Sequence, residues 1–215
     1  MISGKTLAPW LCLSIALSAS ASTPPADGSV SALIASLGRP APARTPFAEA
    51  RFMRVLDQPL VVSGELAWLG GDRLERTVTA PHVESAQIAD GVVTQQREGR
   101  APRRFSLQRA PQLQLLLDSF VALLGGDAAR LQQAFTIELH GDAAGAWSLL
   151  LTPRDAQLAR SVASIRIDGQ AQQPRCMSMR EPDGDLAVDL LGSLAAHMPA
   201  APSREALAQL CQARD

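Results

Sequence analysis

The chain has 215 residues, of which 47% are hydrophobic and 19% are charged, and its formal net charge is −1. This near-neutral balance excludes a general nucleic-acid binder, which would carry a basic surplus. The length is enough for one domain with a sizeable hydrophobic core.

The N-terminus has the layout of a secretory signal. Lys5 precedes the apolar run 7–17, and small residues up to Ala21 precede the predicted cleavage point. The apolar run is shorter than the about 20 residues that a membrane-spanning helix needs. We therefore predict an exported protein with a signal peptide at 1–21, a flexible leader at 22–28 and one domain at 29–215.

The first half of that domain is predicted to consist of one short helix followed by strands. Residues 29–37 have apolar side chains at helical spacing, with Ser29 as N-cap, and 38–46 is a proline-containing loop. Asp90-Gly91 is a strong signal for a two-residue hairpin turn. The predicted strands of this half are 47–56, 60–69, 73–79, 83–89, 92–96 and 103–108.

Period-two alternation assigns side chains to faces in two of these strands. Val62, Gly64, Leu66 and Trp68 share one face of the second strand. In the third strand, the shared face carries Leu74, Arg76 and Val78.

The second half opens on an amphipathic helix, Pro111–Leu124, which Gly125-Gly126 ends. A short helical turn at 127–134, a strand meander over 146–192 and a C-terminal helix at 204–213 follow. The helix at Pro111 carries a wide apolar stripe made of Leu113, Leu116, Leu117, Phe120, Val121 and Leu124. The order of elements has no βαβ alternation, so we predict an α+β, mostly β fold with about 11 antiparallel strands and a few helices over one side.

Two cysteines, Cys176 and Cys211, follow the predicted signal peptide. In an oxidising compartment such a pair is expected to form a disulfide, here between a late strand and the C-terminal helix. A metal site would need further ligands, and none of the three histidines lies at ligand spacing from a cysteine.

Several short motifs fall in a recognisable order. They are Ala50-Arg51-Phe52, Ser63-Gly64-Glu65-Leu66 with Trp68, Pro81 followed by Asp90-Gly91, and Leu150-Leu151-Thr152-Pro153 followed by Ile165-Arg166-Ile167-Asp168-Gly169. Together they resemble the periplasmic outer-membrane lipoprotein carriers, the LolA family. The resemblance covers most of the chain after the signal peptide.

The resemblance implies an incomplete antiparallel β-barrel with helices forming a lid over an apolar cavity. It implies a periplasmic monomer, without enzymatic activity or cofactor, that receives acylated lipoprotein from an inner-membrane transporter and delivers it to an outer-membrane acceptor. The helices at 30–37 and 111–124 are the expected lids. The expected cavity residues are Phe52, Val62, Leu66, Trp68, Leu74, Arg76, Val78, Leu117, Phe120, Leu124 and Trp147.

Some residues leave alternatives open. Gly70-Gly71 stands where the family usually has an arginine-proline pair that helps to latch the lid, which indicates a divergent branch. Its cargo could be a different lipid or glycolipid, and a lipid-sensing interaction domain is a further alternative. Arg76 is predicted either to face an anionic group of the cargo or to pair with Glu75 or Asp72.

Other features favour plain structural interpretations. Trp68 and Trp147 are as compatible with an ordinary core as with a cavity. Asp183-Gly184-Asp185 is predicted to be a hairpin turn, because it lacks the remaining ligands of a calcium loop. The sequence has no Gly-x-Ser-x-Gly, Walker or dinucleotide motif.

Overall fold

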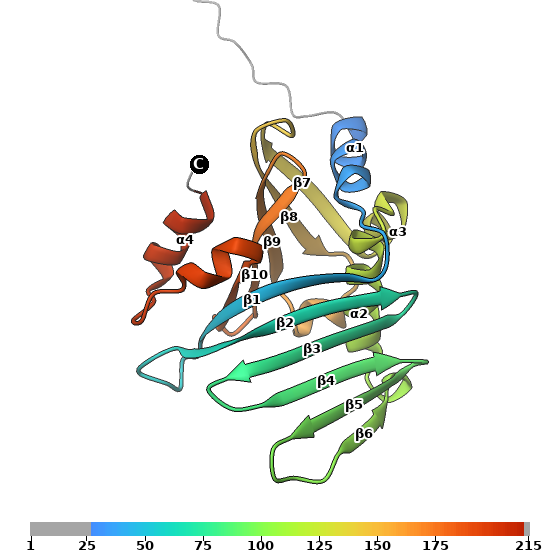
Figure 1. Cartoon of the computed structure of the whole chain (residues 1–215). Helices are drawn as coiled ribbons and strands as arrows, with labels where there is room; N and C mark the ends of the chain where they lie inside the picture. The colour runs from blue at the N-terminus through green and yellow to red at the C-terminus, as the bar shows by residue number, and fades with distance from the viewer. Residues whose placement is uncertain (1–26, 213–215) are drawn as a thin grey trace, which may run out of the picture.

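The computed structural model describes residues 27–212 as an open antiparallel sheet with helices on both of its faces (Figure 1). The predicted signal peptide, 1–21, and residues 22–26 of the predicted leader lie outside the described residues. The first helix begins at Asp27, two residues before its predicted start. Within 27–212, no helix is both long and apolar enough to cross a membrane.

The sheet has eleven strands and is open, which confirms the expected antiparallel sheet of about 11 strands. Their spatial order is β6-β5-β4-β3-β2-β1-β11-β10-β9-β8-β7, so β1 and β11 join the two halves of the sheet. The strands are β1 (Ala43–Phe52), β2 (Leu60–Gly70), β3 (Arg73–Ala80), β4 (Glu84–Ala89), β5 (Val92–Arg97), β6 (Arg103–Ser106), β7 (Phe135–Gly141), β8 (Ala146–Pro153), β9 (Ser164–Gln170), β10 (Gln173–Arg180) and β11 (Leu186–Leu191).

The helices are close to those predicted. They are α1 (Asp27–Leu37), α2 (Pro111–Leu124), α3 (Ala128–Ala134) and α4 (Arg204–Gln212), with 3₁₀ turns η1 (Leu107–Arg109), η2 (Leu158–Arg160) and η3 (Gly192–His197). The prediction for α2 is confirmed at both ends, and the Gly125 N–H closes it by donating to the Val121 carbonyl at 2.9 Å. Ser29 lies inside α1, so the prediction that it is the N-cap was wrong.

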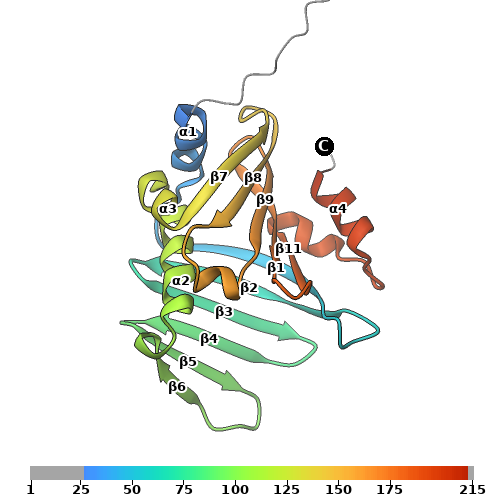
Figure 2. The ribbon, with the colours of Figure 1, turned by 180° about the vertical axis from the view of Figure 1, so that it is seen from behind.

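The helices form two layers on opposite faces of the sheet, whereas they were predicted to lie over one side only (Figures 1 and 2). We call the face covered by α1, α2 and α3 the inner face. There the helices pack on β7 to β10 in a core that includes Phe135, Leu149, Ile165 and Ile167. On the outer face, η3 and α4 pack on β1, β10 and β11 around Leu190 and Leu207.

The start and end of β1 differ from the prediction. Residues 43–46 belong to the strand rather than to a loop, and the chain leaves the sheet after Phe52 rather than at Leu56. Pro46 is tolerated because pairing with β11 begins only at Phe47, which leaves one side of Pro46 open. On an open side the missing N–H of a proline costs no hydrogen bond in the ladder.

Two local predictions hold in the structure. Asp90 and Gly91 have φ values of 52° and 69°, as a type I′ hairpin turn between β4 and β5 requires. Cys176 of β10 and Cys211 of α4 form the predicted disulfide, with an S–S distance of 2.11 Å. The bridge fastens α4 to the outer face of the sheet.

Gly64 lies where β2 and β3 approach closely at an irregularity in their pairing. A Cβ at this position would lie 1.8 Å from the Thr77 carbonyl oxygen. We therefore expect Gly64→Ala to lower the free energy of unfolding by about 1–3 kcal/mol, the usual cost of overpacking. Urea unfolding is the measurement, and Gly145→Ala is the control, because its nearest neighbour would be 3.6 Å away. Equal stability of the two variants would contradict the steric argument.

Candidate functional site

The inner face of β2 to β6 carries a continuous apolar row. Strand pairing places Leu66 opposite Arg76, Trp68 opposite Leu74, and Gly64 opposite Val78. The row continues from Leu74 to Ile88, Val93 and Phe105 on the next three strands. With Val62 at its other end, the row holds five of the eleven residues that were expected to line a cavity, and the charged Arg76 lies among them.

This apolar row belongs to neither of the two core clusters in the described chain. Val78 and Val93 are each only 4% exposed, but Leu66, Trp68 and Leu74 are half-buried. An apolar surface that is neither part of a core nor fully covered can accept an apolar partner.

Helix α2 lies on the inner side of β2 and β3 (Figure 2). Its apolar side chains are divided between two environments. Leu116 and Phe120 pack against the inner core on β7 to β10. Leu117 and Leu124 are half-buried and lie outside that core. Helix α1 differs from α2, because all four apolar residues that define its predicted face are buried in the inner core, namely Val30, Leu33, Ile34 and Leu37.

Two expected cavity residues, Phe52 and Trp147, lie on strands but outside the apolar row. Phe52 lies on the outer face, where it packs in the core of α4 with its ring 5.3 Å from the Arg204 guanidinium, and so it is on the opposite side of the sheet from the apolar row. Successive side chains of a strand point to opposite faces, so Phe52 shares a face with Ala50 and lies on the face opposite to Phe47. Trp147 is on the inner face but is buried in the core with α1 and α3, and its indole N–H donates to the Ala171 carbonyl at 2.7 Å.

Arg76 is neutralised by a residue that the sequence analysis did not identify. Its guanidinium donates to Glu49 Oε2 at 2.9 Å and lies 4.6 Å from the centre of the Phe47 ring. The predicted partners were Glu75, Asp72 or an anionic cargo group. The correction follows from the sheet, because Glu49 on β1 shares the inner face with Arg76, whereas Glu75 points to the other face.

Asp189 lies directly opposite Glu49 on β11 and is only 8% exposed. Burial, and then repulsion by Glu49, raises the pKa of Asp189 to about 7, although Arg76 acts in the opposite direction. The junction between the two halves of the sheet therefore holds a guanidinium and two carboxyl groups, one of which keeps its proton near neutrality.

The predicted turn at Asp183-Gly184-Asp185 is confirmed. The Gly184 N–H donates to the Glu181 carbonyl at 3.0 Å, and Gly184 has a φ of 96°. Carboxylate oxygens of Glu181, Asp183 and Asp185 lie within 4.8 Å of one another. These carboxylates form ion pairs with arginines, because Arg51 bonds Glu181 at 2.7 Å and Arg54 bonds Asp183 at 3.3 Å. In the part of the chain that the structure describes, this cluster is thus a turn whose three carboxylates are paired with two arginines.

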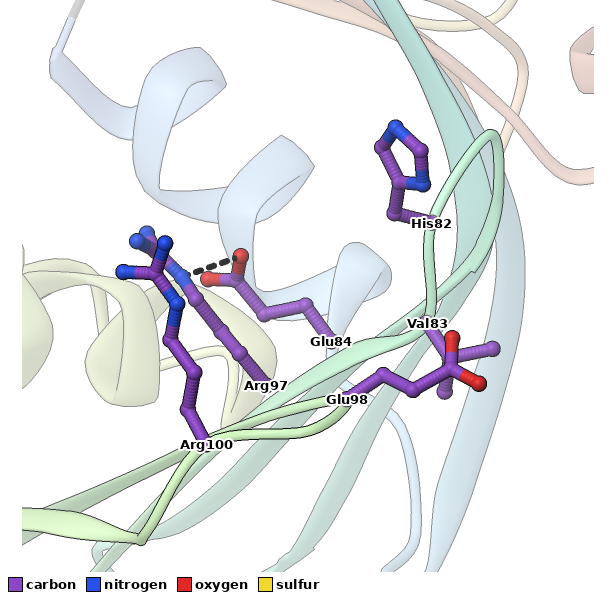
Figure 3. Close-up of a pocket in the computed structure, with 6 residues that line it drawn as sticks. All are labelled: His82, Val83, Glu84, Arg97, Glu98 and Arg100. Atoms are coloured by element: carbon purple, nitrogen blue, oxygen red, sulfur yellow. Dashed lines mark hydrogen bonds and ion pairs between the residues drawn. The ribbon is translucent and has the colours of Figure 1, made fainter.

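A hollow of about 540 Å³ opens at the turns that join β3 to β4 and β5 to β6 (Figure 3). A second, smaller hollow of about 40 Å³ adjoins it along β5 and β6. None of the eleven expected cavity residues lines either hollow. The sequence analysis missed this region, although four closely spaced arginines, at positions 97, 100, 103 and 104, could have indicated an anion-binding surface there. The first hollow is lined by His82, Val83, Glu84, Arg97, Glu98 and Arg100.

The sequence also matches a family model. The model for "Outer membrane lipoprotein carrier protein LolA-like" covers residues 21–214. The chain belongs to this LolA-like family. No curated protein matches the chain significantly.

Solved structures similar to this LolA-like chain are distant in sequence. The LolA superfamily protein NE2245 from Nitrosomonas europaea is 11% identical over 77% of this chain and 91% of that chain, with a TM-score of 0.39. MucB in the Pseudomonas aeruginosa MucA/MucB complex is 16% identical over 85% of this chain and 60% of that chain, with a TM-score of 0.38. A DUF1329 family protein from Desulfovibrio piger is 8% identical over 80% of this chain and 92% of that chain, with a TM-score of 0.41. Membership of the family rests on the family model.

The turn after β2 carries the departure from the LolA pattern. Gly70 and Gly71 both have positive φ there, at 98° and 59°. The nearby Arg73 closes this same turn, because its guanidinium donates to the Leu69 carbonyl at 3.0 Å. The indole N–H of Trp68 also bonds the turn, donating to the Gly71 carbonyl at 2.9 Å.

Proposed function

We propose that this LolA-like protein is a periplasmic carrier that shields the acyl chains of a lipoprotein or related amphiphile. The chains bind between the inner face of β2 to β5 and the half-buried stripe of α2. The carrier receives its cargo from an inner-membrane transporter and releases it to an outer-membrane acceptor, without chemistry and without a cofactor. Family membership and the signal-like N-terminus support this assignment.

The observation that carries the proposal is the apolar row that belongs to no core. Each methylene exposed to water costs about 0.8 kcal/mol, so an acyl chain crossing an aqueous compartment needs an apolar cover. Leu66, Trp68 and Leu74 offer such a surface on the sheet, and Leu117 and Leu124 offer one on α2.

Charged substitutions on the two sides of the proposed cavity test it. We expect Leu74→Asp and Leu117→Asp each to weaken binding of monolauroylglycerol, a neutral single-chain lipid, at least about tenfold, because a buried unpaired carboxylate is strongly unfavourable and Leu74 lies between the apolar Trp68 and Ile88. Isothermal titration calorimetry below the critical micelle concentration measures the affinity. Val92→Asp is the matched control, since Val92 is exposed on the same sheet but faces outward from β5. Unchanged affinity in both inner-face variants would contradict the proposal.

Tryptophan quenching locates the chain independently of affinity. A monoacylglycerol with a brominated acyl chain should quench Trp68, on the apolar row, and leave Trp147 in the closed core unaffected. Quenching should therefore disappear in Trp68→Phe and persist in Trp147→Phe. The reverse pattern would place the lipid outside the proposed cavity.

A further inference from the structure

The apolar row ends in a cluster of arginines on the same face of the sheet. Along β5, the inner-face residues are Val93, Gln95 and Arg97 in succession, and Arg103 lies opposite Gln95 on β6. At about 3.3 Å per residue, Val93 and Arg97 are about 13 Å apart along the strand. The two hollows lie at this end, and Arg97 and Arg100 line both of them.

The arginines of this cluster are not fully neutralised. Arg97 donates its Nε to Glu84 Oε2 at 2.8 Å. Among residues 27–212, neither Arg100 nor Arg103 has a carboxylate partner within ion-pair distance. Figure 3 shows Arg97 and Arg100 reaching to the same side of the hollow, while the carboxylate of Glu98 points away from both.

The turn that presents these arginines is held by its own hydrogen bonds. The Gln96 amide donates to the carbonyls of Arg97 and Arg100 at 3.1 and 2.8 Å, and the Arg100 N–H donates to the Arg97 carbonyl at 3.1 Å. The Glu98 N–H donates to the Val83 carbonyl at 3.3 Å, which joins this turn to the one between β3 and β4. These bonds hold the backbone of the turn from which the exposed side chains of Arg97 and Arg100 project.

We propose that the amphiphile carried by this protein has an anionic headgroup of the phosphate type, bound by Arg97, Arg100 and Arg103 at the end of the apolar row. The inference rests on the proposed function and specifies its cargo. Guanidinium groups bind phosphate oxygens through paired, charge-assisted hydrogen bonds. A lipid fits better than an acidic protein, because all three arginines line hollows and two of them, Arg97 and Arg103, share one sheet face with Val93. The anion site lies here, and not at Arg76, which Glu49 already neutralises.

The test compares two lipids with the same lauroyl chain by calorimetry. Wild-type protein should bind lauroyl lysophosphatidylglycerol about tenfold more tightly than neutral monolauroylglycerol, the effect of two or three charge-assisted contacts at a partly exposed site. The preference should shrink in 0.5 M salt, where exposed charges are screened. In Arg100→Gln/Arg103→Gln the affinity ratio of the two lipids should fall to near one.

A second double variant controls for net charge. Arg104→Gln/Arg109→Gln removes the same charge from residues that do not line the hollows, and Arg104 faces outward opposite Thr94. It should keep the wild-type ratio.

An equal ratio in wild type and Arg100→Gln/Arg103→Gln would overturn the headgroup site while leaving the carrier proposal intact. Absence of binding by either lipid would overturn both. Inorganic phosphate or an acidic peptide binding as tightly as the anionic lipid would also overturn the assignment to a lipid headgroup.

Discussion

Reduction of the Cys176–Cys211 bridge should lower the free energy of unfolding by roughly 3–4 kcal/mol, the loop-closure value for a crosslink of this span. The two cysteines are 35 positions apart in sequence, and the bridge fastens α4 to β10. Without it, the unfolded chain gains the entropy of an open loop, and α4 is held only by side chains such as Leu207 and Leu210. Urea unfolding of the oxidised and the reduced wild-type protein measures the difference.

The variant Cys176→Ala/Cys211→Ala separates the crosslink from other effects of the reductant. Its stability should be close to that of the reduced wild type and should not change when reductant is added. Trypsin provides a local readout, because cleavage at Arg204 at the start of α4 should become faster once the bridge is open. Identical urea midpoints for oxidised and reduced wild type would contradict a stabilising role.

Elements with strong local signals could be predicted from the sequence. The prolyl start, the apolar stripe and the terminal glycines of α2 specify that helix by local chemistry alone. Asp90 and Gly91 specify a hairpin turn because few residue pairs accept two successive positive φ values. The resemblance to the LolA family added the overall arrangement of strands, which local signals do not contain.

The ends of β1 and the face of Phe52 could not be predicted in the same way. Both faces of β1 are covered, by α4 and η3 on one side and by inner-face residues on the other. A strand covered on both sides has no polar face to orient it, so period-two alternation assigns pairs of residues to a common face without showing which face that is. Phe47 and Phe52 lie on opposite faces because an odd number of positions separates them, but alternation alone does not show which of the two points toward α4.

The charged part of the site depends on contacts between strands that are distant in sequence. Glu49, Arg76 and Asp189 come from β1, β3 and β11, and their proximity follows from register rather than from any motif. The sequence showed that Arg76 falls in an apolar row and needs an anionic partner. It could not show that β1 supplies that partner, or that a second carboxyl group lies beside it.

Replacement of Asp189 by asparagine should stabilise the protein at pH 8 by about 2–4 kcal/mol, at 1.36 kcal/mol per pH unit of displaced pKa. Asp189 is 8% exposed, and burial followed by repulsion from Glu49 raises its pKa from 3.8 to about 7. Between these two pH values the folded state binds a proton that the unfolded state has lost. The free energy of unfolding therefore falls as the pH rises through this window, and the full penalty is present above pH 7.

Asparagine has nearly the shape of the protonated carboxyl group and does not ionise, so the difference between Asp189→Asn and wild type should vanish near pH 4.

Asp183→Asn is the matched control. The hydrogen bond from the Asp185 N–H, together with Arg54, lowers the pKa of Asp183, so that carboxylate stabilises the fold above its ordinary pKa and loses this effect as the pH falls. Asp183→Asn should therefore not stabilise the protein at pH 8. Urea unfolding from pH 4 to pH 8 measures both variants, and a stability difference for Asp189→Asn that does not change with pH would show that Asp189 ionises normally in the folded protein.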